Sequence, residues 1–423
     1  MPDRIGLDFG TTNSVVARLH PDGRVTTARA PGAAEVFRSV LCFWTEEAVS
    51  GRPALRHAAG AAAVEAYLDD PLGSRLLLSL KSYLAQRSFA ETRVFGRAFT
   101  VEELVALLLR ALLEASGTEV RGARVVAGRP VRFVGETADD ALGERRLRAA
   151  FAAAGMPDLA VALEPEAAGA RFARTLEGPA TVLIGDFGGG TSDFSILRFD
   201  PGARRGAGGG RVTPLGHAGV GLAGDAFDAR ITDRVVSPHL GRGGSYAVMG
   251  KELPVPPSFF TAFARWHQLS LMRAPRTLRE IAEVARASAT DGAKLRHLIR
   301  LVEDEAGYGL YRAVAAAKAA LSGADRTVLR FRHADFVVEE EIARADFEAW
   351  IAPDLARLSA CVDRALAEAG LRPGEVDRVF LTGGTSLVPA VRRLFETRFG
   401  AGRIVGGGEF VSVAEGLALL GED

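Results

Sequence analysis

Asp8-Phe9-Gly10-Thr11-Thr12-Asn13 and Asp186-Phe187-Gly188-Gly189-Gly190-Thr191-Ser192-Asp193 are two similar turns that begin 178 residues apart. Each stands between two short apolar runs, a pattern that predicts strand, tight turn, strand. A Walker-type loop would instead run from a strand into a helix and end in Gly-Lys-Ser/Thr, which neither stretch does. The flanking runs are Ile5-Gly6-Leu7 and Val15-Val16-Ala17 for the first turn, and Val182-Leu183-Ile184 and Phe194-Ser195-Ile196-Leu197 for the second. Two such hairpins predict a site in which a phosphate chain is bound from both sides.

The residue types in these turns suit that task. Glycines let a backbone approach a phosphate closely, and the exposed N–H groups then form an anion site. An Asp at a strand end needs a cation between itself and a phosphate, so Asp8 and Asp186 predict Mg²⁺ held largely through waters, with Asp193 contributing in the same way. The threonines Thr11, Thr12 and Thr191 add hydroxyl donors. The alternative for either copy is an ordinary glycine-rich hairpin turn, which the matching Asp and Thr in both copies disfavour.

The composition excludes several classes of protein but does not indicate a binding partner. The 423 residues include 52 basic and 52 acidic side chains, so no excess charge predicts binding to nucleic acid or to an anionic membrane. Two cysteines, Cys42 and Cys361, cannot build a disulfide framework or a metal cluster. The first residues lack a signal-peptide pattern, and no apolar run reaches about 18 residues. We therefore expect a cytoplasmic protein of two to three domains or lobes.

Lysine is scarce, since only four of the 52 basic residues are lysines. An arginine bias of this kind is typical of a GC-rich genome, and each retained lysine is a candidate for a site that needs a compact ammonium group. The alternative is a lysine on a solvated surface. The four are Lys81, Lys251, Lys294 and Lys318.

Apolar periodicity predicts alternating strands and helices up to about residue 180, and a second half that starts near 181. Thr100-Val101-Glu102-Glu103 fits a capping box at the start of a helix. Residues 201–210 are expected to form a hairpin tip, residues 225–322 to be mainly helical, and Trp266 and His267 to serve in packing. Strands are expected near 5–7, 15–17, 125–128, 160–163, 182–184, 194–197, 327–333, 336–339 and 379–381, and helices over 101–117, 144–154, from 164 onward, and over 344–369, 389–399 and 413–420.

A third glycine turn, Thr382-Gly383-Gly384-Thr385, lies between a predicted strand and a predicted helix. This arrangement puts backbone N–H groups and a helix N-terminus beside a ligand, which suits a nucleoside or its phosphate. The turn is a weak signal alone, but beside two phosphate hairpins it supplies the nucleoside end of the site.

These stretches closely resemble the signatures of Hsp70 chaperones, which belong to the actin-like ATPase superfamily shared with sugar kinases. The resemblance covers nearly the whole chain, and 79–84 with 265–267 resemble the shorter, bacterial YegD-like relatives. It implies an α/β actin-like (ribonuclease H-like) fold of two lobes, each with a mixed sheet flanked by helices, and a nucleotide cleft between them. Lobe I would span 1–180 and lobe II 181–408, with a mainly helical subdomain at about 226–310 and a C-terminal helix in 409–423 returning to lobe I.

The resemblance also implies roles for individual residues. Asp8 and Asp186 would organise hydrated Mg²⁺, and Lys81 would reach the γ-phosphate and the attacking water. Glu164 would orient that water, and Asp193 would accept a proton or bind a metal water. Contacts to ATP or ADP are implied for Gly10, Thr11, Thr12, Asn13, Gly188, Gly189, Gly190, Thr191, Gly224, Asp225, Lys318, Ser322, Gly383, Gly384 and Thr385. For Lys81 the alternative is a surface lysine, and for Glu164 an ordinary carboxylate at a helix start.

The chain departs from the family pattern in the adenosine pocket. Ala315 stands where the family usually has a glutamate that binds the ribose, and Leu387 where it has an arginine that stacks on the adenine. Phe410-Val411-Ser412 lacks the acidic residue expected before the last helix. These departures leave the affinity for the nucleoside and the preference for a base undetermined. The residues expected to bind the phosphates, in contrast, all match the family pattern. The chain ends at Asp423, which leaves no room for the family's peptide-binding domain.

Three functions follow as hypotheses. The first is a slow, Mg-dependent ATPase that acts as a nucleotide-driven conformational switch and a chaperone, with clients or co-chaperones that the sequence does not identify. The second is a small-molecule kinase, for which Asp139 and Asp140 are the available bases. The third is a nucleotide-binding scaffold or actin-like polymer without turnover.

Overall fold

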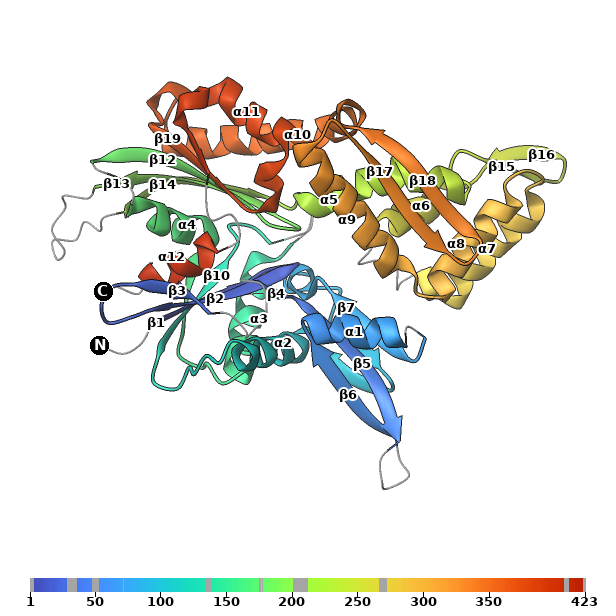
Figure 1. Ribbon diagram of the computed structural model, residues 1–423, viewed down its shortest axis with the longest axis horizontal. Coiled ribbons are helices and arrows are strands. Elements are labelled where there is room, and N and C mark those ends of the chain that lie inside the picture. Colours follow the sequence, from blue (N-terminus) through green and yellow to red (C-terminus); the bar gives the residue numbers. More distant parts are fainter. Residues whose placement is uncertain are drawn as a thin grey trace. The chain divides into compact units, whose positions relative to one another are not determined.

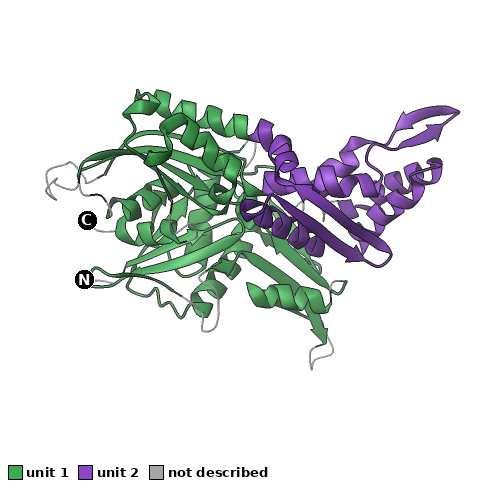
Figure 2. Ribbon diagram, turned by 45° about the horizontal axis from the view of Figure 1, so that its top comes forward, with its two compact units in different colours: residues 1–224, 355–423 green, residues 225–354 purple. Residues whose placement is uncertain are grey.

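The computed structural model describes residues 4–28, 36–47, 53–70, 72–133, 138–174, 176, 178–200, 212–265, 272–406 and 411–420. The chain forms two compact units (Figure 2): Met1–Gly224 with Leu355–Asp423, and Asp225–Asp354. The hairpin tip expected at 201–210, together with Trp266, His267 and Phe410, lies outside the described residues. The units are divided at Gly224 and Leu355, so the lobe boundaries predicted at 180 and 408 stay predictions.

The strands are β1 (Arg4–Phe9), β2 (Asn13–Leu19), β3 (Val25–Thr27), β4 (Phe37–Arg38), β5 (Val40–Glu47), β6 (Pro53–Ala59), β7 (Ser74–Leu78), β8 (Glu91–Val94), β9 (Arg97–Thr100), β10 (Arg124–Arg129), β11 (Leu159–Leu163), β12 (Ala180–Phe187), β13 (Ser192–Phe199), β14 (Val212–Val220), β15 (Ser245–Val248), β16 (Lys251–Pro254), β17 (Arg326–His333), β18 (Phe336–Ala343), β19 (Arg378–Thr382) and β20 (Ile404–Gly406). The α-helices are α1 (Ala61–Asp69), α2 (Val101–Ala115), α3 (Asp140–Ala153), α4 (Glu164–Ala173), α5 (Gly224–Ile231), α6 (Pro257–Ala264), α7 (Pro275–Ala287), α8 (Gly292–Glu303), α9 (Gly307–Gly323), α10 (Arg344–Ala369), α11 (Pro389–Phe399) and α12 (Ser412–Leu420).

The first unit contains two sheets with the same topology (Figure 1). In one, β1 pairs antiparallel with β2 and parallel with β10, which pairs parallel with β11. In the other, β12 pairs antiparallel with β13 and parallel with β19, which pairs parallel with β20. The strand order β11-β10-β1-β2-β3 thus corresponds to β20-β19-β12-β13-β14. This duplication confirms the predicted mixed α/β class and places the two predicted turns at the tips of corresponding hairpins.

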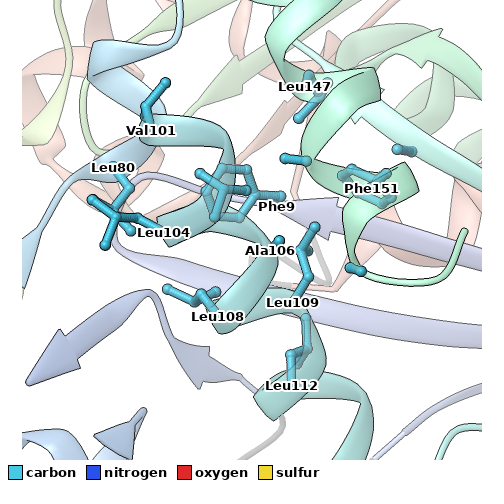
Figure 3. Packing of buried hydrophobic residues seen from close by; sticks show 14 of the residues in the cluster. Phe9, Leu80, Val101, Leu104, Ala106, Leu108, Leu109, Leu112, Leu147 and Phe151 are labelled. Carbon is cyan, nitrogen blue, oxygen red and sulfur yellow. The ribbon is translucent and has the colours of Figure 1, made fainter. Parts of the chain in front are cut away.

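The core of the first half is built around α2, whose predicted start is confirmed. Thr100 accepts a hydrogen bond from the N–H of Glu103, and the Glu103 carboxylate accepts one from the N–H of Thr100, which completes the capping box. One face of α2 then carries leucines and valines into a cluster with Phe9 from the first hairpin and Leu80 (Figure 3). The strand that leads to the first turn and the segment that carries Lys81 therefore share one hydrophobic core.

Close backbone approaches fix α12 in the first unit. Helix α12 packs against α4 and against β1 and β2 (Figure 1). A Cβ added at Gly416 would overlap the carbonyl oxygen of Ala167 in α4, and a Cβ added at Gly6 would overlap that of Ala414. Only glycine permits these separations at either position.

The second unit is mainly helical, as predicted, but its hairpin β15–β16 was not expected. Met249 and Gly250 connect the two strands, and both have positive φ, at 49° and 76°. A two-residue loop of this kind normally contains Asn or Asp before Gly. Because Met249 stands there instead, the sequence does not show the usual pattern of a hairpin turn. Strand β18 is also longer than predicted, because the Arg330–Glu339 and Arg326–Glu341 pairs continue its ladder with β17.

Gly416→Ala tests the α4–α12 contact. Alanine favours a helix over glycine by about 1 kcal/mol, yet here its methyl group must displace the backbone of α4. We expect a net loss of about 1–3 kcal/mol in the free energy of unfolding, as for other overpacked sites, measured by urea denaturation. The control is Gly402→Ala, since nothing lies within 4 Å of a Cβ there; equal stability of the two variants would contradict the contact.

Candidate active site

The two predicted phosphate turns are tight, and in the first one the backbone requires glycine at position 10. A Cβ at Gly10 would overlap the carbonyl oxygen of Asn13. In the second turn the N–H of Gly188 donates to the carbonyl of Thr191 at 2.9 Å. Thr11 and Thr191 are buried, whereas Thr12, Gly189 and Gly190 are half-buried. Both turns therefore present backbone and hydroxyl groups in corresponding places of the two sheets.

Three aspartates stand at the strand ends beside these turns. Asp8 is the second-last residue of β1, and Asp186 is the second-last residue of β12 and faces Asp193 of β13 in the antiparallel register. Asp193 is 1 % exposed and accepts a hydrogen bond from the backbone N–H of Arg132 at 3.2 Å. Gly219 pairs with Asp193 from β14, and a Cβ there would lie only 2.6 Å from Asp193 Oδ1. Gly219 thus leaves room for the carboxylate.

Lys81 lies on a short 3₁₀ turn, Leu80–Tyr83, whose position is set on both sides. Before it, Ser79 has a left-handed backbone (φ 53°), a conformation that costs free energy in a non-glycine residue. Leu80 is buried in the α2 cluster (Figure 3). Lys81 Nζ donates to Glu164 Oε1 at 2.6 Å, and the two side chains are only 7 % and 6 % exposed.

Arg146 of α3 holds the segment that follows Lys81. Its guanidinium donates to the carbonyl oxygens of Tyr83, Leu84, Gln86 and Phe89, at 3.3, 3.2, 3.1 and 2.7 Å. It also pairs with Glu102 at 3.3 Å. The sequence offers no signal for this residue, because α3 carries several arginines at neighbouring positions.

Glu164 begins α4, as predicted, with Pro165 in its first turn. Its side chain lies over β10, where a Cβ at Gly128 would come within 2.9 Å of Glu164 Cγ. Asp8, Asp186 and Asp193 all interact electrostatically with Glu164 and Lys81, so the structure brings these five residues from separate segments into one cluster.

Four carboxylates around one ammonium group make this cluster electrostatically unusual. Burial, reinforced by Glu164, raises the pKa of Asp8 to about 7 against the opposing effect of Lys81. Burial and Glu164 likewise raise the pKa of Asp193 to about 7, and burial with the neighbouring carboxylates raises that of Asp186 well above its ordinary value. Burial by itself would lower the pKa of Lys81, but Glu164 and Asp8 outweigh it and raise that pKa.

The cluster suits a hydrated divalent cation in both charge and donor chemistry. Carboxylate oxygens are the ligands that Mg²⁺ prefers, and Mg²⁺ usually keeps several of its waters. Among the residues that the structure describes, no three His, Cys, Asp or Glu side chains form a group that could hold a metal ion. Coordination through waters by Asp8 and Asp186, as expected from the sequence, stays a prediction.

The third glycine turn adjoins the second hairpin. Strand β19 pairs with β12 so that Thr382 faces Asp186. Gly383 has φ 86°, and a Cβ there would overlap the carbonyl oxygen of Phe187. Gly384 begins a 3₁₀ turn, Gly384–Leu387, in which Thr385 is buried and Leu387 is exposed. The predicted order of strand, glycine pair and helix is confirmed.

The remaining predicted nucleotide contacts are Gly224, where the first part of the first unit ends, and three residues of the second unit on α5 and α9. Gly224 begins α5 and is followed by Asp225, whose pKa burial and Asp228 raise to about 6. Lys318 of α9 donates to Asp228 at 2.8 Å. The i, i+3 and i+7 spacing puts Ala315, Lys318 and Ser322 on one face of α9.

Asp139 and Asp140, the bases considered for a kinase, have structural partners. Asp139 caps α3 by accepting from the N–H of Leu142 at 2.9 Å, and it pairs with Arg87 at 2.7 Å. Asp140 accepts from the N–H of Phe133 at 2.8 Å. Asp139 therefore serves the start of α3, and Asp140 holds the segment at Phe133 against it.

Duplicated sheets with paired glycine hairpins define the class of actin-like nucleotide-binding folds, and comparison with known proteins agrees. A family model described as "Hsp70 protein" matches residues 290–421. The chain is 26% identical over 423 residues to the chaperone protein DnaK of Thermus thermophilus, covering 95% of this chain and 57% of that one. It is 28% identical over 416 residues to the chaperone protein HscA homolog of Azotobacter vinelandii, covering 92% and 52%.

The chain is thus similar to Hsp70 proteins, by the family model in its C-terminal part and by the two chaperones over most of its length. It spans just over half the length of the curated relatives it matches. Within the described part of the chain, no helix combines the length and apolar character that a membrane span requires.

Replacing Lys81 and Glu164 one at a time tests the charge balance of the cluster. Lys81→Met leaves four carboxylates without their ammonium group, so we expect a loss of about 3–5 kcal/mol in the free energy of unfolding. Glu164→Gln removes one of those carboxylates and should be clearly milder. The loss for Lys81→Met should be larger at pH 8 than at pH 5, since Asp8 and Asp193 ionise near pH 7.

Urea denaturation without divalent ions or nucleotide measures these differences. Lys251→Met, at an exposed lysine of β16, is the matched control and should leave stability unchanged. Equal losses for Lys81→Met and Glu164→Gln at both pH values would contradict the proposed balance.

Proposed function

We propose that this protein is an Hsp70-type, Mg-dependent ATPase with slow turnover, which acts as a nucleotide-driven conformational switch. The observation that carries the proposal is the buried Lys81–Glu164 pair, set among three aspartates beside two matching glycine hairpins. In phosphoryl transfer, positioning and charge neutralisation provide most of the catalysis. The cluster contains groups for both.

Each residue has a definite part in this proposal. The hairpins at Gly10–Asn13 and Gly188–Thr191 bind the phosphates through N–H and hydroxyl groups. Asp8 and Asp186 hold hydrated Mg²⁺, which supplies charge neutralisation at the phosphates when it is bound. Lys81 donates to the γ-phosphate and to the attacking water, Glu164 orients that water, and Asp193 accepts its proton.

The nucleoside end is proposed on the resemblance and on one local observation. Gly383, Gly384 and Thr385 form a turn that supplies backbone N–H groups next to β12. Gly224, Asp225, Lys318 and Ser322 are proposed to bind the ribose and the adenine. Ala315 and Leu387 weaken this end, because each lacks the charged group that the family pattern places there.

A chaperone role, protein clients or co-chaperones, a cytoplasmic location and a bacterial, YegD-like subtype complete the proposal. The support for them is the resemblance and the similarity to DnaK and HscA, which bear the name chaperone. A kinase is less well supported, because Asp139 is engaged in capping α3 and Asp140 in holding the backbone at Phe133. A scaffold without turnover would leave the buried Lys81–Glu164 pair without a purpose.

Purified protein should hydrolyse ATP slowly with Mg²⁺ and without an added acceptor. Asp8→Asn and Lys81→Ala should reduce phosphate release at least about a hundredfold, in keeping with the loss of a transition-state charge contact. The assay measures inorganic phosphate at a temperature at which circular dichroism shows each variant folded.

Asp22→Asn and Lys251→Ala are the controls, because both side chains are exposed and neither residue belongs to the turns or to the charged cluster. Unchanged turnover in Asp8→Asn and Lys81→Ala would refute the site assignment. Turnover that appears only with a sugar or a carboxylic acid would favour the kinase.

Calorimetry with ATP, ADP and GTP should show that the protein prefers adenine over guanine nucleotides only weakly. Ala315→Glu and Leu387→Arg would each restore one missing group, and each should tighten ADP binding by about fivefold to tenfold, equivalent to about 1 kcal/mol. The matched control Leu72→Arg places the same charge on another exposed leucine and should have no effect. If neither restoring variant tightens ADP binding, the adenosine assignment is wrong.

A further inference from the structure

His217 of β14 joins two elements that carry the proposed catalytic groups. Its Nδ1 lies 2.6 Å from Ser195 Oγ on β13. Its Nε2 lies 3.5 Å from Glu166 Oε1 in the first turn of α4. The imidazole therefore bridges α4 and the second sheet, from which Glu164 and Asp193 come.

The bridge runs alongside the proposed hydrolytic groups. Glu166 follows Glu164 by two residues within the same helical turn, and Ser195 follows Asp193 by two residues on the same strand. Residues two apart on a strand share a face, so Ser195 and Asp193 project on the same side of β13. A change in the His217 contacts would move α4 relative to β13, and with it Glu164 relative to Asp193.

The backbone around His217 is fixed against a third element. The N–H of His217 donates to the Glu368 carboxylate of α10 at 3.0 Å. A Cβ at the preceding Gly216 would come within 2.7 Å of the Ala369 backbone nitrogen. Strand β14 is thus held against α10 at this point, and the imidazole projects from a rigid base.

A Ser-His-Glu series also occurs in hydrolases, where the serine attacks a substrate. That role is excluded here because Ser195 is 0 % exposed and no substrate can reach its hydroxyl. His217 and Glu166 are also mostly buried, at 21 % and 23 % exposure. The three side chains serve to connect elements.

We propose that His217 is a positioning residue, which through Glu166 and Ser195 fixes the placement of Glu164 relative to Asp193 during ATP hydrolysis. This inference rests on the proposed ATPase function. Nucleotide binding depends on the hairpins, whereas turnover depends on the alignment of the two carboxylates. A displacement of about 1 Å at a reacting group lowers the rate by up to about a hundredfold.

The test compares wild type with His217→Gln, Glu166→Gln and the double variant. Each single variant should lower kcat about tenfold and leave the KM for ATP within about twofold, since only alignment is lost. The double variant should be no slower than the slower single variant, because both changes break one connection. His20→Gln is the matched control: His20 Nε2 lies 2.7 Å from the hydroxyl of Thr26 in the same unit, and its replacement should leave kcat unchanged.

Hydrogen–deuterium exchange supplies a readout that is independent of turnover. Amides of residues 164–170 should exchange faster in His217→Gln than in His20→Gln. Unchanged kcat in His217→Gln, a rise in KM alone, or unchanged exchange would each overturn the inference. If His217→Gln does not fold, the same readouts on Glu166→Gln decide.

Absence of turnover in wild type refutes the proposed ATPase, and the exchange comparison then decides whether His217 positions α4. Turnover in wild type with no effect in the variants refutes the positioning role alone. The two failures are therefore distinguishable.

Discussion

The buried contact between Lys81 and Glu164 is the interaction on which the site depends. Removing two charges from water costs several kcal/mol per ion, and a buried pair rarely contributes net stability. The surrounding structure nevertheless accommodates it: Gly128 leaves space for the Glu164 side chain, and Leu80 anchors the lysine segment in the core. Strongly perturbed carboxylates gathered around such a pair are typical of functional sites. A catalytic role best explains why the protein retains a cluster that lowers its stability.

The duplicated topology explains why the site forms where it does. Strands β1 and β12 correspond, and each has an aspartate as its second-last residue and leads into a glycine turn. Helices α4 and α12 follow the corresponding strands β11 and β20, and they pack on each other at Gly416. The symmetry ends at their first turns, since α4 begins with Glu164-Pro165 and α12 with Ser412. Of the two corresponding helix starts, only that of α4 contributes a residue to the charged cluster.

The sequence predicted what local chemistry encodes and missed what depends on distant contacts. Glycine, threonine and aspartate marked both hairpins, and the Thr100 capping box marked the start of α2 correctly. The scarcity of lysine marked Lys81 as one of four candidates, but its role and that of Glu164 came only from the resemblance. Because 83 residues separate the two, no local pattern says that they meet. Arg146 and His217 were not found at all. Their partners are carbonyl groups and side chains that the fold brings close, and nothing in their neighbouring residues distinguishes them.

This difference bears on how far a signature can predict activity. The signature residues supply the carboxylates and the groups proposed to bind phosphate, but their alignment is set elsewhere. Arg146 holds the segment after Lys81 through four carbonyl oxygens, and Gly219 leaves the space that Asp193 occupies. Phosphoryl transfer depends chiefly on such alignment. Two chains with identical turns can therefore differ widely in turnover, because residues outside the turns determine whether lysine, glutamate and aspartate meet in a productive geometry.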